Sequence, residues 1–282
     1  MNKKIAIILV NYNGLKDTIE CIESIYKSNY DNYEIIVIDN ASEESSEALM
    51  KFDKVYYKKL SDNFGFGVAN NIGAEIALNN DAELIMCLNN DTIIDENLLL
   101  NMSKLTDDRT ITTCAMYYYE DKKELWYGGG TVSRIKGNFR HRRYKENKQI
   151  SFVTGCCFMF TASCYKEIGL FDDNYFMYCE DADFSLKATQ KGYKLLYIFS
   201  AKLWHKVGRS MGSYSDLREY YLTRNRLYLL KKYRKEFVFT AFLYYYFTRG
   251  IYILKAIVLN KNYKVYIEAI SDYKKMKMKK KD

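Results

Sequence analysis

The sequence has no proline, and its seven cysteines include no C-x-x-C pair. Zinc sites and disulfide frameworks place cysteines at characteristic spacings, whereas here only Cys156 and Cys157 are neighbours. The cysteine pattern therefore argues against both and is typical of reduced, cytosolic thiols. We attribute the lack of proline, together with the 28 tyrosines, to compositional bias rather than to function.

No signal peptide precedes the first apolar run, which begins at Ile5, and we therefore expect a cytoplasmic location. The sequence also lacks an internal repeat and a complete G-x-G-x-x-G motif. Gly65-Phe66-Gly67 comes nearest to that motif, but it follows the third predicted strand, which argues against a dinucleotide site. The composition, 48% hydrophobic and 28% charged over 282 residues, fits one large domain or one domain with a small appendage.

Charge is distributed unevenly along the chain. Residues 218–282 contain 17 Lys and Arg against five Asp and Glu, whereas the other 217 residues contain 26 against 30. The chain thus has a slightly acidic body and a basic tail, and an anionic surface is the expected partner of the tail.

Residues 84–91 combine five apolar residues with a polar end, Asn89-Asn90-Asp91. A short apolar run of this kind predicts a strand that is buried on both faces, with its polar end at the carboxyl edge of a parallel sheet. Open α/β sheets bind ligands at that edge, and Asp91 is placed to hold a hard divalent cation there. The alternative is a strand that simply ends in an Asx turn.

The first half of the sequence alternates between predicted strands and helices. Strands are expected at residues 5–10, 34–39 and 55–57, and helices at 15–26, 43–51 and 68–76. Such alternation predicts a parallel sheet, in which all strand ends lie on one edge. Asn11, Asp39 and Asp91 should therefore converge into a polar site.

The second half is less regular. We expect helices at 96–105 and 181–191, strands at 111–116, 151–160 and 193–198, and a basic helical segment from residue 215. Residues 126–148 show no periodicity and are expected to form a long exposed loop. The apolar segment 237–259 is long enough to span a bilayer, but Arg249 and Lys255 would each cost ~2.5–3.5 kcal/mol at its centre. We expect it to lie on a membrane or against another subunit, as in a homo-oligomer.

Several motifs occur in an order and spacing that, taken together, resemble one family. They are Val10-Asn11-Tyr12-Asn13, Asp39-Asn40-Ala41-Ser42, the segment 63–73, Leu88-Asn89-Asn90-Asp91, Thr154-Gly155-Cys156, Gly169-Leu170-Phe171-Asp172, the segment 176–183, Trp204-His205 and the segment 220–225. The chain resembles family 2 glycosyltransferases of the branch that includes bacterial rhamnosyl- and galactosyltransferase-like enzymes. The resemblance implies an α/β fold of the GT-A type over residues 1–214, which is a Rossmann-like nucleotide-sugar-binding sheet, followed by a helical, basic extension over 215–282.

The resemblance also implies an activity: transfer of a sugar, with inversion, from a UDP- or dTDP-linked donor to a hydroxyl of a glycan or lipid-linked acceptor. Such enzymes act in surface polysaccharide synthesis, which fits a peripheral position at the inner face of the cell membrane. Mn²⁺ or Mg²⁺ is the implied cofactor, and nucleic acid is not an expected partner.

Family roles can be carried over to individual residues. Asp39 should contact the nucleotide base, Asp91 the metal ion, and Asp181 should be the catalytic base. The expected nucleotide-sugar-binding residues are Asn11, Asn13, Asp39, Asn63, Asn71, Asn89, Asn90 and Asp91. His205 is a possible second metal ligand, with a structural role as the alternative. Asn89 replaces the first Asp of the Asp-x-Asp found in many relatives, so we expect modest metal affinity.

Three further residues are expected contacts of the acceptor or of a phosphate: Trp204, Glu180 and Arg224. Asp181 opens a predicted helix, whose N-terminus should keep its carboxylate ionised with a low pKa. Two other functions were weighed. A sugar-phosphate nucleotidyltransferase needs a basic, glycine-rich loop after the first strand, which Asn11-Tyr12-Asn13-Gly14 is not. A protein that only binds nucleic acid or an anionic surface would leave the Asn and Asp strand ends without a role.

Overall fold

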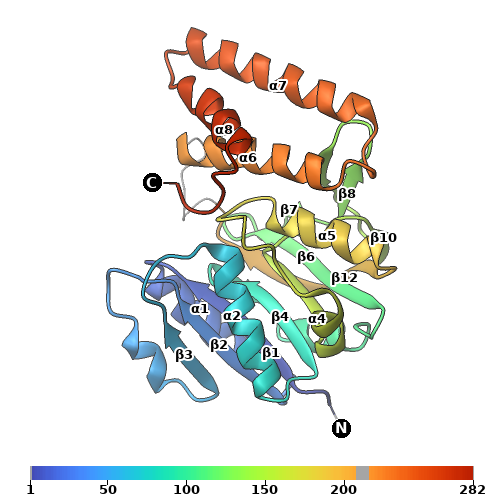
Figure 1. Cartoon of the computed structure of the whole chain (residues 1–282). Coiled ribbons are helices and arrows are strands. Elements are labelled where there is room, and N and C mark those ends of the chain that lie inside the picture. The colour runs from blue at the N-terminus through green and yellow to red at the C-terminus, as the bar shows by residue number, and fades with distance from the viewer. Residues whose placement is uncertain (1, 208–215, 282) are drawn as a thin grey trace.

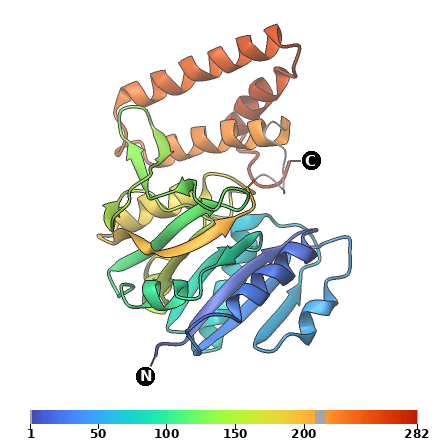
Figure 2. The same cartoon turned by 180° about the vertical axis from the view of Figure 1, so that it is seen from behind.

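The computed structural model describes residues 2–207 and 216–281, and the expected boundary between residues 214 and 215 lies outside these ranges. Its main sheet is mixed, with the strand order β10-β12-β6-β11-β4-β1-β2-β3. Helices cover both faces (Figure 1), with α2, α4 and α5 on one side and α1 on the other, as the reverse view in Figure 2 shows. The expected α/β fold is confirmed.

The parallel half of the sheet follows the predicted alternation. It contains β1 (Ile5–Asn11), β2 (Tyr33–Asp39), β3 (Val55–Lys59) and β4 (Leu84–Asn89), with α1 (Leu15–Ile25) and α2 (Phe66–Asn79) between them. Every residue of β1 except Val10 is fully buried or nearly so, as expected for a strand with helices on both faces. The segment 43–51, predicted to be a helix, forms only the short 3₁₀ helix η1 (Glu47–Lys51).

The other half combines parallel and antiparallel pairs. It contains β5 (Thr92–Ile94), α3 (Leu98–Ser103), β6 (Thr110–Tyr118), β11 (Cys157–Thr161), α4 (Ala162–Ile168), α5 (Glu180–Gln190) and β12 (Lys194–His205). The last strand is longer than the predicted 193–198, because its pairing with β6 resumes after a register shift and continues to His205. The predicted strand 151–160 begins only at Cys157, and α4 was not predicted.

The expectation of an exposed loop at 126–148 is wrong. This region contains β7 (Leu125–Tyr127), the hairpin β8 (Gly130–Ser133) and β9 (Asn138–His141), and the start of β10 (Lys148–Ile150). Strands of three or four residues are too short to show a periodicity. The hairpin turn packs on the C-terminal helices so closely that a Cβ on Gly137 would lie 2.6 Å from Leu230.

The C-terminal segment forms α6 (Asp216–Lys232), α7 (Phe239–Val258) and α8 (Lys264–Lys274). These helices lie at one end of the sheet, and α7 is the farthest from it (Figure 1). Two further apolar clusters join them to the body, one around Tyr175 and Leu229 and one around Phe176 and Tyr266. Within the described ranges, no helix has the length and apolar character needed to cross a membrane.

Candidate active site

The ends of the parallel strands meet, as predicted. Asn11 and Asp39 are register partners across β1 and β2, and Asn89 pairs with Val10 from the other side. Asn11 Nδ2 donates to Asp39 Oδ2 over 2.8 Å and to the hydroxyl of Ser42 over 3.2 Å. This buried network fixes the loops after β1 and β2 relative to each other.

Asp39 is closed to solvent in this structure. Its exposed fraction is 0%, and its Oδ1 accepts from the amide of Ser42 over 2.7 Å. Contact between Asp39 and a nucleobase stays a prediction. Asn13 reinforces that segment: it is exposed, adopts a left-handed backbone (φ 53°), and accepts from the amide of Glu43 over 2.8 Å.

Asn63 and Asn71 both bind other parts of the chain. The side chain of Asn63 accepts from Asn40 Nδ2 over 2.8 Å, and Asn71 binds the backbone of Phe171 through both its amide atoms. Between them, Gly65 (φ +91°) allows the carbonyl of Phe176 to approach so closely that a Cβ would lie 2.2 Å from it. The start of α2 is thereby held against the segment that leads to Asp181.

Asp91 and His205 come together at the end of the sheet. The imidazole Nε2 lies 3.1 Å from Asp91 Oδ1, because β12 pairs with β5 and places His205 opposite Thr92. Both side chains are about nine-tenths buried. Asp91 Oδ1 and His205 Nδ1 have no hydrogen-bond partner among the described residues. The structure thus brings together the two residues expected to bind the metal.

Two residues that sequence reasoning missed hold His205 in place. The ring of Trp126 packs edge-on against the imidazole at 4.7 Å between centroids.

Lys206, which is 2% exposed, donates its backbone amide to the Asp91 carbonyl over 3.0 Å. Its ammonium binds Asp17 Oδ1 (2.7 Å) and Glu20 Oε2 (2.5 Å) on α1. Burial acts to lower the pKa of Lys206, but these two carboxylates outweigh it and raise that pKa. The only sequence signal was that Trp126 is one of two tryptophans.

The donor atoms of Asp91 and His205 suit a divalent cation, but they would supply only part of its coordination shell. A buried carboxylate oxygen without a hydrogen bond and an imidazole nitrogen beside it are suitable ligands, and Mg²⁺-type ions commonly take one or two carboxylates plus substrate phosphates. No group of three or more His, Cys, Asp or Glu side chains able to hold a metal exists in the described part of the chain. Further ligands would have to be other groups, such as substrate phosphates, water or amide oxygens.

Asn89 and Asn90 flank this position differently. The backbone amide of Asn89 donates to the carbonyl of Cys156 over 2.8 Å, and its side chain is half-buried. Asn90 Nδ2 donates to the hydroxyl of Thr18 over 2.8 Å and lies 3.5 Å from Asn11 Oδ1. Asn90 therefore extends the buried network that begins at Asn11.

Asp181 lies at the start of α5 and is half-buried. Its Oδ2 accepts from the amide of Gly155 over 3.0 Å and its Oδ1 from the amide of Ala182 over 2.7 Å. Since the next residue after Gly155 binds Asn89, residues 155–156 connect the Asp91 end of the sheet to Asp181. The two key carboxylates thus lie on either side of one short segment.

The expectation of a low pKa for Asp181 is wrong. Burial raises the pKa of Asp181 to about 6, against the lowering effect of its hydrogen bonds to backbone amides. Burial, and then the charge of Asp181, raises the pKa of the neighbouring Glu180 to about 8. Two adjacent carboxyl groups whose pKa values are pushed apart are typical of acid–base sites. Burial thus disfavours the charged form of both carboxyl groups, and of Glu180 more than of Asp181.

Asp183, two residues further on, belongs to the packing rather than the site. It is 1% exposed and binds Lys232 (2.7 Å) as well as the hydroxyls of Tyr175 and Tyr233 (both 3.0 Å). All of its acceptor capacity is directed at α6 and the segment before α5, so it has no position open to a substrate.

Two of the expected acceptor or phosphate contacts lie elsewhere. Arg224 is 1% exposed, stacks on Tyr221, and donates to the carbonyls of Lys277 (3.2 Å) and Lys279 (2.8 Å). It therefore anchors the C-terminal tail. Trp204 precedes His205 in β12 and must point to the opposite face of the strand, where its indole donates to the Lys122 carbonyl over 3.4 Å.

Comparisons with known proteins identify the fold. The fold is that of GT-A glycosyltransferases: a solved structure of TarS residues 1–349 from S. aureus, in complex with UDP-GlcNAc, superposes with a TM-score of 0.65 at 16% identity, covering 97% of this chain and 81% of that one. A mannosyltransferase from Pyrobaculum calidifontis, in complex with GDP-Man and Mn²⁺, gives 0.61 at 14% identity and covers 83% and 65%.

The sequence itself identifies the family. The model of Glycosyl transferase family 2 matches residues 6–169, more than half of the 282 residues, and the chain belongs to this family. The dTDP-rhamnosyl transferase RfbF of Shigella flexneri is 23% identical over 246 residues, which is 82% of this chain and 81% of RfbF. The N-acetylglucosaminyl-diphospho-decaprenol L-rhamnosyltransferase of Mycobacterium tuberculosis is 29% identical over 75 residues, 26% of this chain and 24% of that protein. The resemblance to the rhamnosyltransferase-like branch is thus confirmed.

Proposed function

We propose that the protein is an inverting, metal-dependent glycosyltransferase that moves a hexose from a UDP- or dTDP-linked sugar to a hydroxyl of a glycan or lipid-linked acceptor. The observation that carries the proposal is that residues 155–156 contact both Asp181 and Asn89, which lies two residues before the Asp91 that is paired with His205. A one-step inversion needs its leaving group and its base on opposite sides of the sugar carbon, and we assign the leaving-group side to Asp91 and the base side to Asp181.

Each side has a distinct task. Asp91 and His205 would hold Mn²⁺ or Mg²⁺, which stabilises the negative charge of a departing diphosphate. Asp181 accepts the proton of the acceptor hydroxyl as its oxygen forms the new bond to the anomeric carbon. Its raised pKa makes it a stronger base than an exposed aspartate while it remains ionised at pH 7.

The outer face of α7 supports a position at the membrane. Phe239, Leu243, Phe247, Leu254 and Val258 follow the spacing of one helix face, and each is more than half exposed. The opposite face, with Ala241 and Tyr245, is buried against the protein. An apolar face on a basic helical segment is suited to the interface of an anionic bilayer, as the cytoplasmic leaflet is. A lipid-linked acceptor, as named for the mycobacterial relative, would be reached there.

Two measurements test the proposal. The purified protein is heated with a panel of UDP- and dTDP-sugars, with Mn²⁺ and with EDTA, since a ligand that binds the folded state raises the unfolding temperature. A donor that stabilises only with Mn²⁺ is then incubated with acceptors, and NMR of the product reports the anomeric configuration. Failure of every nucleotide-sugar to stabilise the protein, or retention of configuration, would contradict it.

A further inference from the structure

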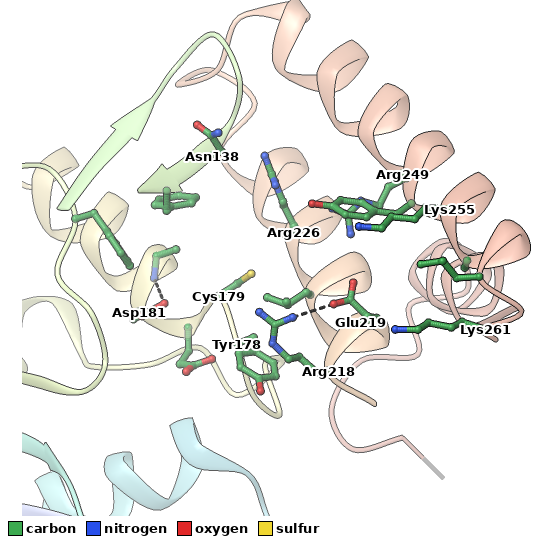
Figure 3. Close-up of a pocket in the computed structure, with 18 residues that line it drawn as sticks. Asn138, Tyr178, Cys179, Asp181, Arg218, Glu219, Arg226, Arg249, Lys255 and Lys261 are labelled. Atoms are coloured by element: carbon green, nitrogen blue, oxygen red, sulfur yellow. Dashed lines mark hydrogen bonds and ion pairs between the residues drawn. The ribbon is translucent and has the colours of Figure 1, made fainter. Parts of the chain in front are cut away.

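A pocket of about 620 Å³ lies between the β8–β9 hairpin, the start of α5, and helices α6 and α7. Asp181 lines it at one end, with Arg226 in the middle and Arg249 and Lys255 towards the far side (Figure 3). Asp91 and His205 are not among its lining residues. The pocket thus adjoins the catalytic base but not the metal site.

Arg249 is a buried cation with unused capacity to donate. It is 7% exposed, its Nη1 donates to the hydroxyl of Thr223 over 3.0 Å, and its guanidinium lies 4.5 Å from the ring centre of Tyr252. Its Nε is buried and has no hydrogen-bond partner. A guanidinium donor without an acceptor is costly in a folded protein, so such a group calls for an explanation.

Arg226 is held in place beside it. The guanidinium donates from Nε to the carbonyl of Gly137 (3.1 Å) and from Nη2 to that of Lys136 (3.2 Å), which ties α6 to the hairpin turn. Burial, and then the charge of Arg249, lowers the pKa of Arg226. Among the residues that the structure describes, no carboxylate forms an ion pair with either arginine. Neither cation therefore has a paired counter-charge in the described part of the chain.

The carboxylates in the pocket wall do not supply one. Glu219 binds Arg218 Nη1 over 2.8 Å and the hydroxyl of Tyr266 over 3.2 Å. Burial raises the pKa of Glu180 to about 8, which disfavours its charged form. Asp181 accepts two backbone amides at the far end. Within residues 2–207 and 216–281, therefore, no carboxylate offers the two arginines a free counter-charge, which leaves room for an anionic ligand.

We propose that Arg226 and Arg249 bind a phosphate group carried by the acceptor, an inference that rests on the proposed function. Guanidinium groups match phosphate oxygens in geometry as well as charge. The phosphate belongs to the acceptor rather than the donor because the pocket adjoins Asp181, which takes the acceptor proton, and excludes Asp91. One wall of the pocket is formed by α7, whose outer face is apolar. A diphosphate that joins a sugar to a lipid would therefore lie between the membrane and Asp181.

The test is a direct binding measurement that needs no turnover. A sugar joined to a short prenyl chain through a diphosphate is titrated into the full-length protein in EDTA, where donor diphosphate is not held at Asp91. The same sugar on a neutral alkyl chain, and inorganic phosphate alone, are titrated in parallel. Variants are Arg226→Gln, Arg249→Gln and Arg249→Lys, with Arg234→Gln, an exposed arginine outside the pocket, as the matched control.

Hydrogen bonds to charged groups contribute ~1.5–3 kcal/mol, so each Gln variant should weaken binding of the diphosphate compound by about ten-fold or more, while Arg249→Lys loses less. The neutral compound should bind every variant equally. Unchanged affinity in both Gln variants, or equal losses for the neutral compound, would overturn the inference. Inorganic phosphate that binds as tightly as the diphosphate compound would assign the site to free phosphate instead.

Two controls separate this result from other failures. Thermal unfolding of each variant reports whether the buried Arg249 is needed for folding. If the Arg249 variants do not fold, the binding measurement on Arg226→Gln, which changes a half-buried residue, tests the inference instead. Mn²⁺-dependent binding of the donor sugar should be unchanged in all variants. A protein that binds the diphosphate compound but no nucleotide-sugar would contradict the proposed function and leave the phosphate site standing.

Discussion

His205 Nε2 lies 3.1 Å from Asp91 Oδ1, and that oxygen is buried without a hydrogen bond. The two residues are brought together by the pairing of β5 with β12, so the proposed metal site depends on contact between segments more than 100 residues apart in the sequence. The backbone amide of Lys206 on the carbonyl of Asp91 fixes the same junction. A measurement of metal binding at this position would therefore test both the strand pairing and the proposed catalytic role.

We predict that Asp91→Asn abolishes the Mn²⁺-dependent rise in unfolding temperature given by the donor sugar. Loss of even an indirect metal partner costs ~10–100-fold in affinity, and loss of a direct ligand should cost at least that. His205→Gln should weaken Mn²⁺ binding in the same assay but less severely. Calorimetric titration of Mn²⁺ in the presence of nucleotide diphosphate checks both, and equal Mn²⁺ affinity in Asp91→Asn would remove it from the metal site.

The strand-end residues could be predicted because each follows a local pattern. A short apolar run that ends in Asn or Asp marks the carboxyl end of a buried parallel strand, and Asn11 and Asp39 meet as that rule requires, with Asn89 and Asn90 at the neighbouring strand end. The same patterns do not reveal solvent exposure, and the complete burial of Asp39 emerged only from the hydrogen bonds of the loop that follows it.

Contacts between distant segments could not be predicted from local patterns. Asp183 has Lys187 four residues on, yet it binds the distant Lys232, and Lys187 donates to the carbonyl of Leu170. Trp126 and the cations of the pocket are similar cases, because nothing in their own neighbourhoods in the sequence indicates their partners. The raised pKa of Asp181 likewise arises from burial, which outweighs the helix N-terminus.

The paired carboxyl groups give the reaction a defined pH dependence. Because Asp181 must be ionised to act as a base and its pKa is about 6, kcat should fall as the pH drops below about 6. Asp181→Asn should lower kcat by ~10²–10⁴-fold with nearly unchanged donor affinity. A pH–rate profile of the wild type, measured with saturating substrates, checks the first point. A profile that is flat between pH 5 and 8 would rule Asp181 out as the base.

Glu180 should couple stability to pH. Its folded pKa, about 8, lies above the usual carboxyl value, so the folded state binds more protons than the unfolded state between those values. The free energy of unfolding should therefore fall as the pH rises through this window. Glu180→Gln, which keeps the shape and cannot ionise, should flatten that decline. Urea denaturation at pH 5 and pH 9 measures it, and an identical decline in the variant would assign the effect to other groups.

Membrane binding should depend on the outer face of α7. Leu243, Phe247 and Leu254 are 55%, 66% and 64% exposed, so their joint replacement by Gln leaves the core intact. We expect this variant to lose most of its binding to anionic liposomes in a flotation assay. Deleting 237–282 is a poorer test, since it would uncover the cluster that contains Tyr245. Met50→Gln, a 61% exposed residue of η1, is the control, and unchanged flotation of the triple variant would refute the membrane role.

The last prediction concerns Asn225, which we expect to position Asp181. Tyr178 and Cys179 adopt left-handed backbone conformations (φ 67° and 74°) immediately before α5, which non-glycine residues rarely adopt. Asn225 is fully buried on α6, and its Nδ2 donates to the carbonyls of Met177 (2.8 Å) and Tyr178 (3.0 Å). These bonds hold the strained turn that fixes where α5 begins and therefore where the carboxylate of Asp181 lies.

Asn225→Ala leaves two carbonyls without their donor, and a buried unsatisfied group costs ~1–3 kcal/mol of stability. The variant should also lower kcat while donor affinity stays near the wild-type value, because Asp91 and His205 are untouched. A purely structural role predicts the stability loss alone. The distinguishing readout is the pH–rate profile: with Asp181 displaced from the amide of Gly155, which lowers its pKa, the acidic limb should move to higher pH. Asn262→Ala, at an exposed asparagine bound to Asp216, is the matched control. An unshifted acidic limb with normal kcat in Asn225→Ala would show that the turn holds its geometry without this residue.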